Sequence, residues 1–253
     1  MSAADRFDGQ NVWVTGASQG IGLAVARRFH ALGATVTAFD RTAAPAAEGP
    51  WQRVTLDISD AAAVAGTCAA LLAAGTGVDV LANVAGILRM GAVDDTADAD
   101  WRDSFAVNVS GPFHLMRALI PQFKARRRGC IVTVSSNAAH VPRVGMAAYG
   151  ASKAALTSLC MTAGLELAEY GVRCNVVSPG STDTPMQRGM WSGPDGAAGT
   201  IAGNPSAYKL GIPLKKLATP EDIAAAVVFL ASPAAGHITL ADILVDGGAT
   251  LGR

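Results

Sequence analysis

Tyr149 and Lys153 are two residues whose types and spacing could carry out acid–base chemistry. They lie four positions apart at the start of a segment expected to be helical over 147–170, and residues at i and i+4 share one helix face. A free phenol, with a pKa of about 10, is a poor base at neutral pH. A neighbouring ammonium, together with a positively charged cofactor ring, would stabilise the phenolate and lower that pKa. Because Tyr-x-x-x-Lys is also a common exposed pair, the spacing alone does not identify a site.

A glycine-rich turn, Thr15-Gly16-Ala17-Ser18-Gln19-Gly20-Ile21-Gly22, could bind a dinucleotide. Glycines let the backbone turn tightly and approach a pyrophosphate, and a helix N-terminus offers free N–H groups and a positive dipole end. An ordinary glycine-rich turn is the alternative, but a strand expected before this turn and a helix after it favour the dinucleotide. The predicted contacts here are Gly16, Ser18, Gln19, Gly20, Ile21 and Gly22.

Asp40 follows the next expected strand and bears on which dinucleotide would bind. A carboxylate at this position can accept both ribose hydroxyls of NAD and would repel the 2′-phosphate of NADP. The adjacent Arg41 would in principle favour NADP, and Asp40 could instead be a solvated turn residue. With the carboxylate in the discriminating position we predict NAD, with Asp40 and Arg41 both beside it.

Short β-branched runs alternate with longer alanine-rich segments almost to the end of the chain. This alternation predicts an α/β fold, a single doubly wound Rossmann-type parallel sheet of about seven strands with helices on both faces. No linker marks a second domain, so residues 1–253 are expected to form one. The predicted strands are 11–15, 34–39, 53–56, 78–82, 130–135, 172–178 and 241–245, and the predicted helices are 21–32, 61–74, 101–127, 147–170 and 221–231. The long irregular stretch 179–213, rich in Gly, Pro and Ser, is expected to be a lid-like loop.

Charge and cysteine usage exclude several functions. Lys plus Arg and Asp plus Glu both number 20, so nothing suggests the basic face that nucleic acid or an anionic membrane requires. The basic run 124–128 is interpreted as a helix terminus before Gly129. Four scattered cysteines without CxxC argue against a metal site and a disulfide framework. Without a signal core near the N-terminus or a membrane-length apolar stretch, a cytoplasmic protein with reduced thiols is expected.

Taken together, the motifs resemble the short-chain dehydrogenase/reductase family from end to end. The glycine turn, Asn83-Val84-Ala85-Gly86, Asn108, Ser136, Tyr149-Gly150-Ala151-Ser152-Lys153 and Pro179-Gly180 stand in that family's order and spacing, although the common form of the second motif has another Asn. The resemblance implies that Tyr149 is the acid/base and that Lys153 holds the nicotinamide ribose and tunes Tyr149. It also implies that Ser136 binds the reacting oxygen and that Asn108 holds a water in a proton relay. Ser135 competes with Ser136, but it is one residue off the spacing and should face the other side of its strand.

The same resemblance implies further contacts and an assembly. Cofactor contacts are expected at Asp57, Ile58, Asn83, Ala85, Gly86, Lys153, Pro179, Gly180, Thr182 and Thr184. A homotetramer is expected, assembled through the helices at 101–127 and 147–170 and the C-terminal strand region.

Several longer segments resemble one branch of the family, whose members oxidise a carboxylated cyclohexadiene diol to a catechol for siderophore synthesis. These segments are 86–91, 138–146, 171–184 and 237–240, with agreement also at 11–17 and 245–252. They imply a small-molecule, carboxylated cyclic diol as the substrate. Alternatives are a 3-oxoacyl carrier-protein reductase or a polyol or sugar dehydrogenase of the same family, and a non-catalytic NAD-sensing protein.

A carboxylated substrate needs a cation in its pocket, and an arginine can hold a carboxylate through two hydrogen bonds. Arg143, between Ser136 and Tyr149, is the first candidate. Arg89 is the second, and Arg188 lies in the lid-like loop. Each of these arginines could instead be a solvated surface residue. His140 is a candidate to hydrogen-bond a substrate hydroxyl, although a lone loop histidine is more often structural.

Overall fold

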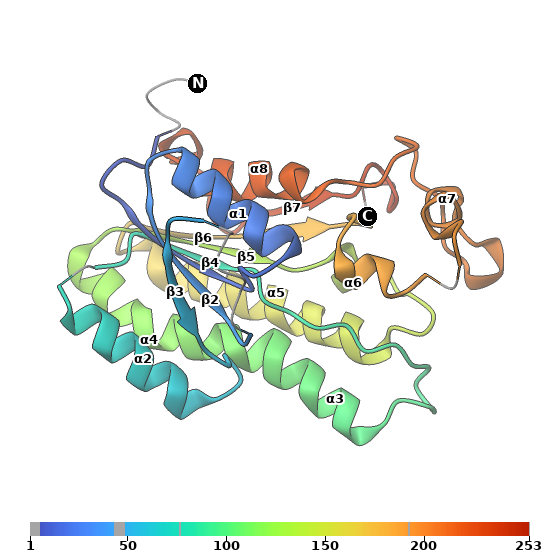
Figure 1. The fold of residues 1–253 in the computed structure, drawn as a ribbon, viewed down its shortest axis with the longest axis horizontal. Helices are drawn as coiled ribbons and strands as arrows, with labels where there is room; N and C mark the ends of the chain where they lie inside the picture. Colours follow the sequence, from blue (N-terminus) through green and yellow to red (C-terminus); the bar gives the residue numbers. More distant parts are fainter. Residues whose placement is uncertain (1–5, 43–48, 76, 192, 253) are drawn as a thin grey trace.

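A seven-stranded, fully parallel sheet forms the centre of the computed structural model, which describes residues 6–42, 49–75, 77–191 and 193–252 (Figure 1). The strands run in the order β3-β2-β1-β4-β5-β6-β7, so the winding direction reverses between β1 and β4. A crevice at the carboxyl ends of the strands beside such a reversal is the usual ligand site of this architecture. The strands are β1 (Asn11–Thr15), β2 (Thr35–Asp40), β3 (Gln52–Thr55), β4 (Val80–Asn83), β5 (Gly129–Val134), β6 (Val172–Pro179) and β7 (Asp242–Val245).

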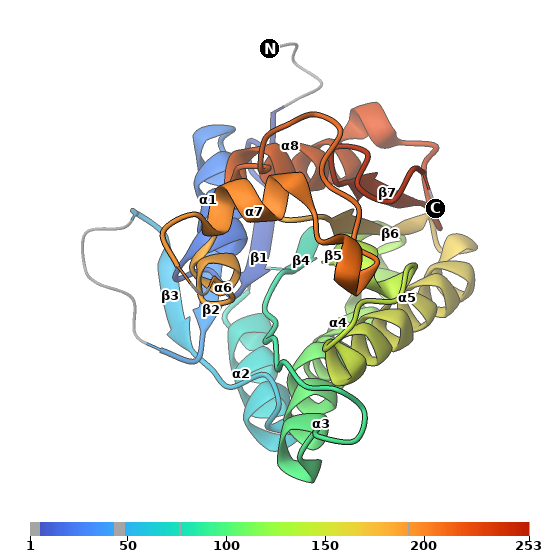
Figure 2. The same cartoon turned by 90° about the vertical axis from the view of Figure 1, so that its right-hand side faces the viewer.

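Helices cover both faces of the sheet, each over its own hydrophobic cluster (Figures 1 and 2). The faces carry α1 and α8 on one side and α2, α4 and α5 on the other. Buried Val and Ile residues on the strands supply both clusters, as expected for parallel strands buried on both faces. The helices are α1 (Gly20–Ala31), α2 (Ala61–Ala73), α3 (Asp98–Phe105), α4 (Gly111–Arg126), α5 (Ala147–Ala168), α6 (Pro185–Arg188), α7 (Gly196–Ala202) and α8 (Pro220–Ala231). The predicted fold class is confirmed.

The helix predicted over 101–127 is wrong as a single element. It divides into α3, a π-helical turn at Ala106–Ser110 and α4. Pro112 has no N–H and cannot make the α-helical bond back to Asn108, and the Gly111 N–H instead reaches the Ala106 carbonyl. The interruption lies at a residue that the family resemblance assigns to the site, Asn108, which is fully buried.

The prediction of an irregular stretch over 179–213 is also partly wrong. Within it, α6 begins with the Thr184 hydroxyl accepting a hydrogen bond from Gln187 N–H, and α7 is followed by an isolated bridge between Asn204 and Lys209. Ser192, in the same stretch, lies outside the described residues, as do the first five residues of the chain. Figure 2 shows α6 and α7 in front of the carboxyl ends of the strands.

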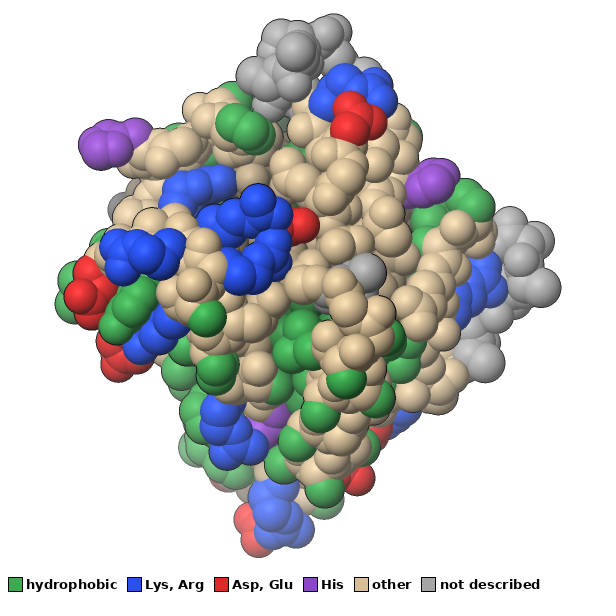
Figure 3. All heavy atoms as spheres, turned by 90° about the vertical axis from the view of Figure 1, so that its left-hand side faces the viewer, with side chains coloured by type: hydrophobic (Ala, Val, Ile, Leu, Met, Phe, Trp, Pro, Cys, Tyr) green, Lys and Arg blue, Asp and Glu red, His purple; other side chains and the backbone are tan. Residues whose placement is uncertain are grey.

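At the amino ends of the strands, Lys and Arg side chains gather on the surface around an acidic group (Figure 3). Asp79 accepts hydrogen bonds there from Arg126 and Arg128, both at 2.6 Å, and from the Asn11 N–H at 2.9 Å. The basic run is therefore a helix terminus, as predicted, since α4 ends at Arg126 and Arg127 adopts a left-handed conformation (φ 49°). In the described part of the chain, no helix is long and apolar enough to cross a membrane.

Candidate active site

The glycine turn lies at the base of a cleft of about 310 Å³. Gly16 has a φ of 68°, and a Cβ there would lie 2.8 Å from the Ala85 Cα. A Cβ on Gly22 would lie 2.0 Å from the Gly16 carbonyl oxygen, so neither glycine can be replaced without moving the backbone. Thr15 holds the opposite wall, because its hydroxyl accepts the N–H groups of Val84 and Ala85 at 3.0 and 3.1 Å. This close approach of two strand ends leaves backbone exposed to the cleft, as a dinucleotide cradle requires.

Most residues predicted to contact the cofactor line this cleft or the neighbouring pockets. The cleft wall includes Gly16, Gln19, Gly20, Ile21, Gly22, Asp40, Arg41, Asp57, Ile58, Ala85, Gly86 and Thr184. Ser18 lines an adjoining pocket with Asp40, and Pro179, Gly180 and Thr182 line the pocket described below. Asn83 is the exception: it is buried, lines none of these pockets, and donates to the Thr133 hydroxyl at 3.3 Å. Its side chain joins β4 to β5.

Two carboxylates that line the cleft are held in place by hydrogen bonds from neighbouring residues. Asp40 accepts the Ser18 N–H at 3.0 Å and the Thr42 N–H at 3.2 Å, so it fastens the glycine turn while lining the cleft. Asp57 accepts the Ser59 hydroxyl at 2.6 Å, and this hydrogen bond lowers the pKa of Asp57 below its usual value. Both are therefore preorganised acceptors.

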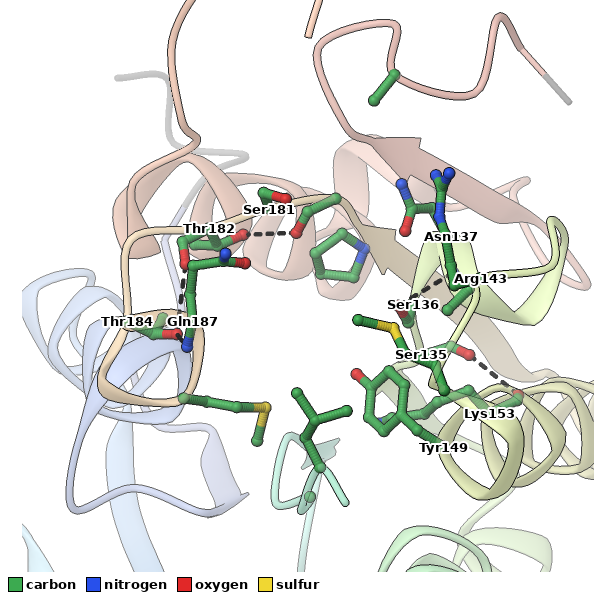
Figure 4. A pocket seen from close by; sticks show the side chains of 18 of the residues that line it. Ser135, Ser136, Asn137, Arg143, Tyr149, Lys153, Ser181, Thr182, Thr184 and Gln187 are labelled. Carbon is green, nitrogen blue, oxygen red and sulfur yellow. Dashed lines mark hydrogen bonds between the residues drawn. The ribbon is translucent and has the colours of Figure 1, made fainter. Parts of the chain in front are cut away.

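Tyr149, Lys153 and Ser136 share a second pocket, of about 140 Å³, which adjoins the cleft and is also lined by residues of α6 (Figure 4). Tyr149 points its hydroxyl into this cavity, and Ser136 faces it from the end of β5. The Ser136 hydroxyl also accepts the Ala138 N–H at 3.1 Å. Ser135 is turned toward α5, where its hydroxyl donates to the Lys153 carbonyl at 3.1 Å, as strand alternation predicts.

Lys153 is buried beneath Tyr149. Its Nζ lies 5.8 Å from the centre of the Tyr149 ring and donates to the Val134 carbonyl at 3.0 Å. A Cβ on Gly86 would lie 3.3 Å from that Nζ and 3.2 Å from the Asn108 Oδ1. The missing side chain at this glycine therefore leaves room for the Lys153 ammonium and the Asn108 amide. The one bond to Val134 leaves two of the three ammonium donors for a ligand.

The predicted lowering of the Tyr149 pKa requires a positively charged cofactor ring as well as the ammonium, and in the protein alone this pKa is raised. Burial raises the pKa of Tyr149 above its ordinary value, and a hydrogen bond with Ser136 lowers it only in part. Burial also lowers the pKa of Lys153 to about 8. The spacing of the pair therefore brings the groups together as predicted, but in the protein alone desolvation outweighs any stabilisation of the phenolate.

The Asn108 side chain is engaged with the chain after β4. Its Oδ1 accepts the Ile87 N–H at 2.8 Å, and its Nδ2 donates to the Ile87 carbonyl at 2.9 Å and to the Ser152 hydroxyl at 3.0 Å. Ser152 in turn donates to the Tyr149 carbonyl at 2.8 Å. The Asn108 amide thus connects the segment that follows β4 to the start of α5.

Of the residues predicted to bind the substrate, Arg143 lines the pocket and two others do not. Arg89 forms ion pairs with Asp100 at 3.1 Å and Asp103 at 3.7 Å. His140 lies 2.7 Å from Asp242 on β7. Both side chains are engaged elsewhere, because acidic residues of α3 pack beside Arg89 and an acidic residue of β7 packs beside His140.

Arg188, considered with them, forms an exposed ion pair with Asp183 at 2.7 Å. Residues that sequence reasoning missed come mainly from the 179–213 segment: Met186, Gln187, Met190, Lys209, Leu210 and Ile212 line the pocket. No motif marks them. The expected lid-like loop over 179–213 is the only signal in the sequence that points to this segment.

Comparison with known proteins agrees with this architecture. The family profile described as enoyl-(acyl carrier protein) reductase matches residues 16–250. The 2,3-dihydro-2,3-dihydroxybenzoate dehydrogenase of Escherichia coli (strain K12) is 56% identical over 97% of this chain and 99% of its own.

Two solved structures are similar along almost the whole chain. A short-chain dehydrogenase/reductase family protein has a TM-score of 0.82 and 38% identity, covering 95% of this chain and 97% of its own. A putative NAD(P)-dependent gluconate 5-dehydrogenase from Beutenbergia cavernae with bound NADP has a TM-score of 0.89 and 32% identity, covering 98% and 100%. The chain therefore belongs to the short-chain dehydrogenase/reductase family of oxidoreductases.

Proposed function

We propose that this protein oxidises 2,3-dihydro-2,3-dihydroxybenzoate to 2,3-dihydroxybenzoate, a siderophore precursor, with NAD as the oxidant. The observation that carries the proposal is 56% identity, over nearly the full length of both chains, to a dehydrogenase of that substrate. The pocket is consistent with it, since Arg143 lies in the same cavity as Tyr149 and Ser136. A guanidinium can hold the carboxylate while the reacting hydroxyl lies between the tyrosine and the serine.

In the proposed mechanism Tyr149 is the general base. Its phenolate takes the proton of the substrate hydroxyl, while Ser136 donates a hydrogen bond to the same oxygen as it becomes a carbonyl. A bound nicotinamide supplies the acceptor for the hydride that leaves the carbon. The resulting cyclohexadienone tautomerises to a catechol, and the gain of aromaticity draws the oxidation forward.

Lys153 has two roles in this proposal. Its two remaining N–H donors suit the hydroxyls of the nicotinamide ribose. Its ammonium, together with the positive charge of an oxidised nicotinamide, lowers the pKa of the phenol and offsets the burial that raises it. Acidification of Tyr149 therefore depends on a bound cofactor.

Asn108 supports a proton relay through its backbone. Its side-chain amide is committed to Ile87 and Ser152, and Pro112 cannot donate to its carbonyl as an α-helical residue would. We propose that this carbonyl holds a water, which passes the proton away from Tyr149 by way of Lys153.

Asp40 is the basis for proposing NAD within the nicotinamide cofactors that the family uses. Its carboxylate lines the cleft beside the end of β2, where it can accept ribose hydroxyls and repel a 2′-phosphate. Arg41 lines the same cleft. NADP would be favoured only if the Arg41 guanidinium bound the 2′-phosphate.

The decisive experiment mixes the protein, NAD and the dihydrodiol carboxylate and follows NADH absorbance. We expect NADH and a catechol to appear together. If nothing forms while a panel of polyols and 3-oxoacyl substrates with both cofactors does react, another activity of the family applies. If nothing reacts although NAD binds, a cofactor-sensing role is favoured.

A homotetramer and a cytoplasmic location stay predictions. Exposed apolar side chains on α3, α4, α5 and α8, namely Trp101, Phe113, Leu165 and Phe229, would suit subunit contacts. Light scattering of the purified protein tests the tetramer.

A further inference from the structure

We infer that Lys209 determines the specificity of this enzyme by holding the substrate carboxylate together with Arg143. The inference rests on the proposed carboxylated substrate. It assigns to the 179–213 segment a direct part in choosing that substrate.

The two cations reach one cavity from two separate segments of the chain. Arg143 comes from the connection between β5 and α5, and Lys209 from the segment between β6 and α8. The same cavity is lined by Tyr149 and Ser136. A ligand whose hydroxyl lies at Tyr149 and whose carboxylate lies between the two cations would therefore be held at two separate points.

The backbone of Lys209 is fixed by a small hairpin. Its N–H donates to the Asn204 carbonyl at 3.0 Å, and the Asn204 N–H donates back at 2.8 Å. Gly203 has a φ of 89°, and a Cβ there would lie 2.4 Å from the Gly211 nitrogen, so the turn requires glycine. Lys209 is thus presented on a preformed element.

Arg143 and Lys209 are cations without an acidic partner at short range. Neither has a carboxylate within 4.0 Å in the described part of the chain, whereas Arg89 and Arg188 are already paired there. Asp246 attracts Arg143 from farther away, but it accepts three hydrogen bonds from Gly248 and Thr250. The pocket therefore keeps an excess of positive charge that a ligand anion can neutralise.

Electrostatics supports the same conclusion. Burial lowers the pKa of Lys209, and the nearby Arg143 lowers it further. Burial also lowers the pKa of Arg143, which Asp246 partly opposes. Two half-buried cations that repel each other are unfavourable unless an anion lies between them. A carboxylate between them would raise the pKa of both groups back toward their ordinary values, but a neutral diol would not.

Binding of a matched ligand pair tests this directly. Titration calorimetry with the NADH-loaded protein compares 2,3-dihydroxybenzoate with catechol, which lacks the carboxylate. We expect Lys209→Met to weaken 2,3-dihydroxybenzoate about 50-fold, as for the loss of one hydrogen bond between charged groups, and catechol by less than about 3-fold. Lys209→Arg should retain most of the affinity. Lys216→Met, which removes an exposed ammonium that also lies between β6 and α8, is the matched control and should change the affinity for neither ligand.

Kinetics gives a second readout. Lys209→Met should raise KM for the dihydrodiol carboxylate with little change in kcat, and the preference over the neutral diol should fall toward 1. Equal weakening of both ligands, or unchanged binding of 2,3-dihydroxybenzoate, would overturn the role of Lys209. Absence of turnover by the unmodified protein, with the calorimetric difference intact, would instead overturn only the proposed oxidation.

Discussion

The two ends of the sheet each bury a charged group, but they provide it with different partners. At the amino ends, Asp79 is 8% exposed and pairs with Arg126 and Arg128 as well as a backbone N–H. At the carboxyl ends, Lys153 is 3% exposed and donates to a backbone carbonyl, with no ion pair to a carboxylate among the described residues. The first charge has the partners that it needs, and the second has only one neutral acceptor.

The pKa values record this difference. Burial by itself raises the pKa of Asp79, but its hydrogen bonds from Asn11, Arg128 and Arg126 outweigh burial and lower the pKa overall. For Lys153 burial prevails and lowers the pKa to about 8. The amino end is organised for stability, and the carboxyl end accepts a cost that only ligands can offset.

The largest expected effect concerns the carboxyl end alone. Tyr149→Phe removes the proposed base and should lower kcat by about 10³-fold or more, because general base catalysis contributes on this scale. NAD affinity by fluorescence titration and the free energy of unfolding should stay close to those of the unmodified protein. Near-normal turnover would show that the base lies elsewhere.

The next effect concerns the amino end alone. Asp79→Ala leaves the Arg126 Nη2 and the Asn11 N–H without their acceptor, although Arg126 keeps its bond to the Val78 carbonyl. This loss should lower the free energy of unfolding by about 3 kcal/mol in urea titrations. Turnover at low temperature should be unchanged. Arg128→Ala is the milder control, since this side chain is 65% exposed and should cost less than about 1 kcal/mol. A large loss of kcat in Asp79→Ala would mean that the two ends are coupled.

The third prediction concerns the buried ammonium of Lys153 and is tested by measuring the free energy of unfolding as a function of pH. Between pH about 8 and 10.5 the unfolded chain binds the Lys153 proton more strongly than the folded protein, so unfolding free energy should rise with pH through this window. Lys153→Met should remove a rise of about 2 kcal/mol measured without cofactor. Tyr149, whose raised pKa reduces stability above pH 10, opposes this rise only at the upper edge of the window. Parallel profiles would contradict a depressed Lys153 pKa.

The smallest expected effect concerns Asp40, whose carboxylate lines the cofactor cleft and also fixes the glycine turn. Asp40→Ala should reduce kcat/KM for NAD about 10-fold and raise that for NADP, because ribose acceptors and repulsion of the 2′-phosphate are lost together. Asp60→Ala, which removes the N-cap carboxylate of α2, is a control that should affect stability but not cofactor choice. An unchanged cofactor preference would indicate that Asp40 serves only the glycine turn.

Local pattern was enough to predict most of the fold and the core of the site. Alternating β-branched and alanine-rich segments specify parallel strands with helical crossovers, and the spacing of Tyr149 and Lys153 puts both on one turn of α5. The glycines of the first turn are readable because no other residue fits where Gly16 and Gly22 lie. These features depend on neighbours within a few residues.

Tertiary structure decided the rest. Whether Arg89 or Arg143 is free depends on acidic residues that other segments bring beside it. Lys209 shares a pocket with Arg143 only because the fold brings the hairpin at 204–209 to that pocket. The direction of the Tyr149 pKa follows from burial, which the whole fold creates. Spacing along a chain specifies which residues share a helix face. Charge compensation and desolvation depend on segments that meet only after folding.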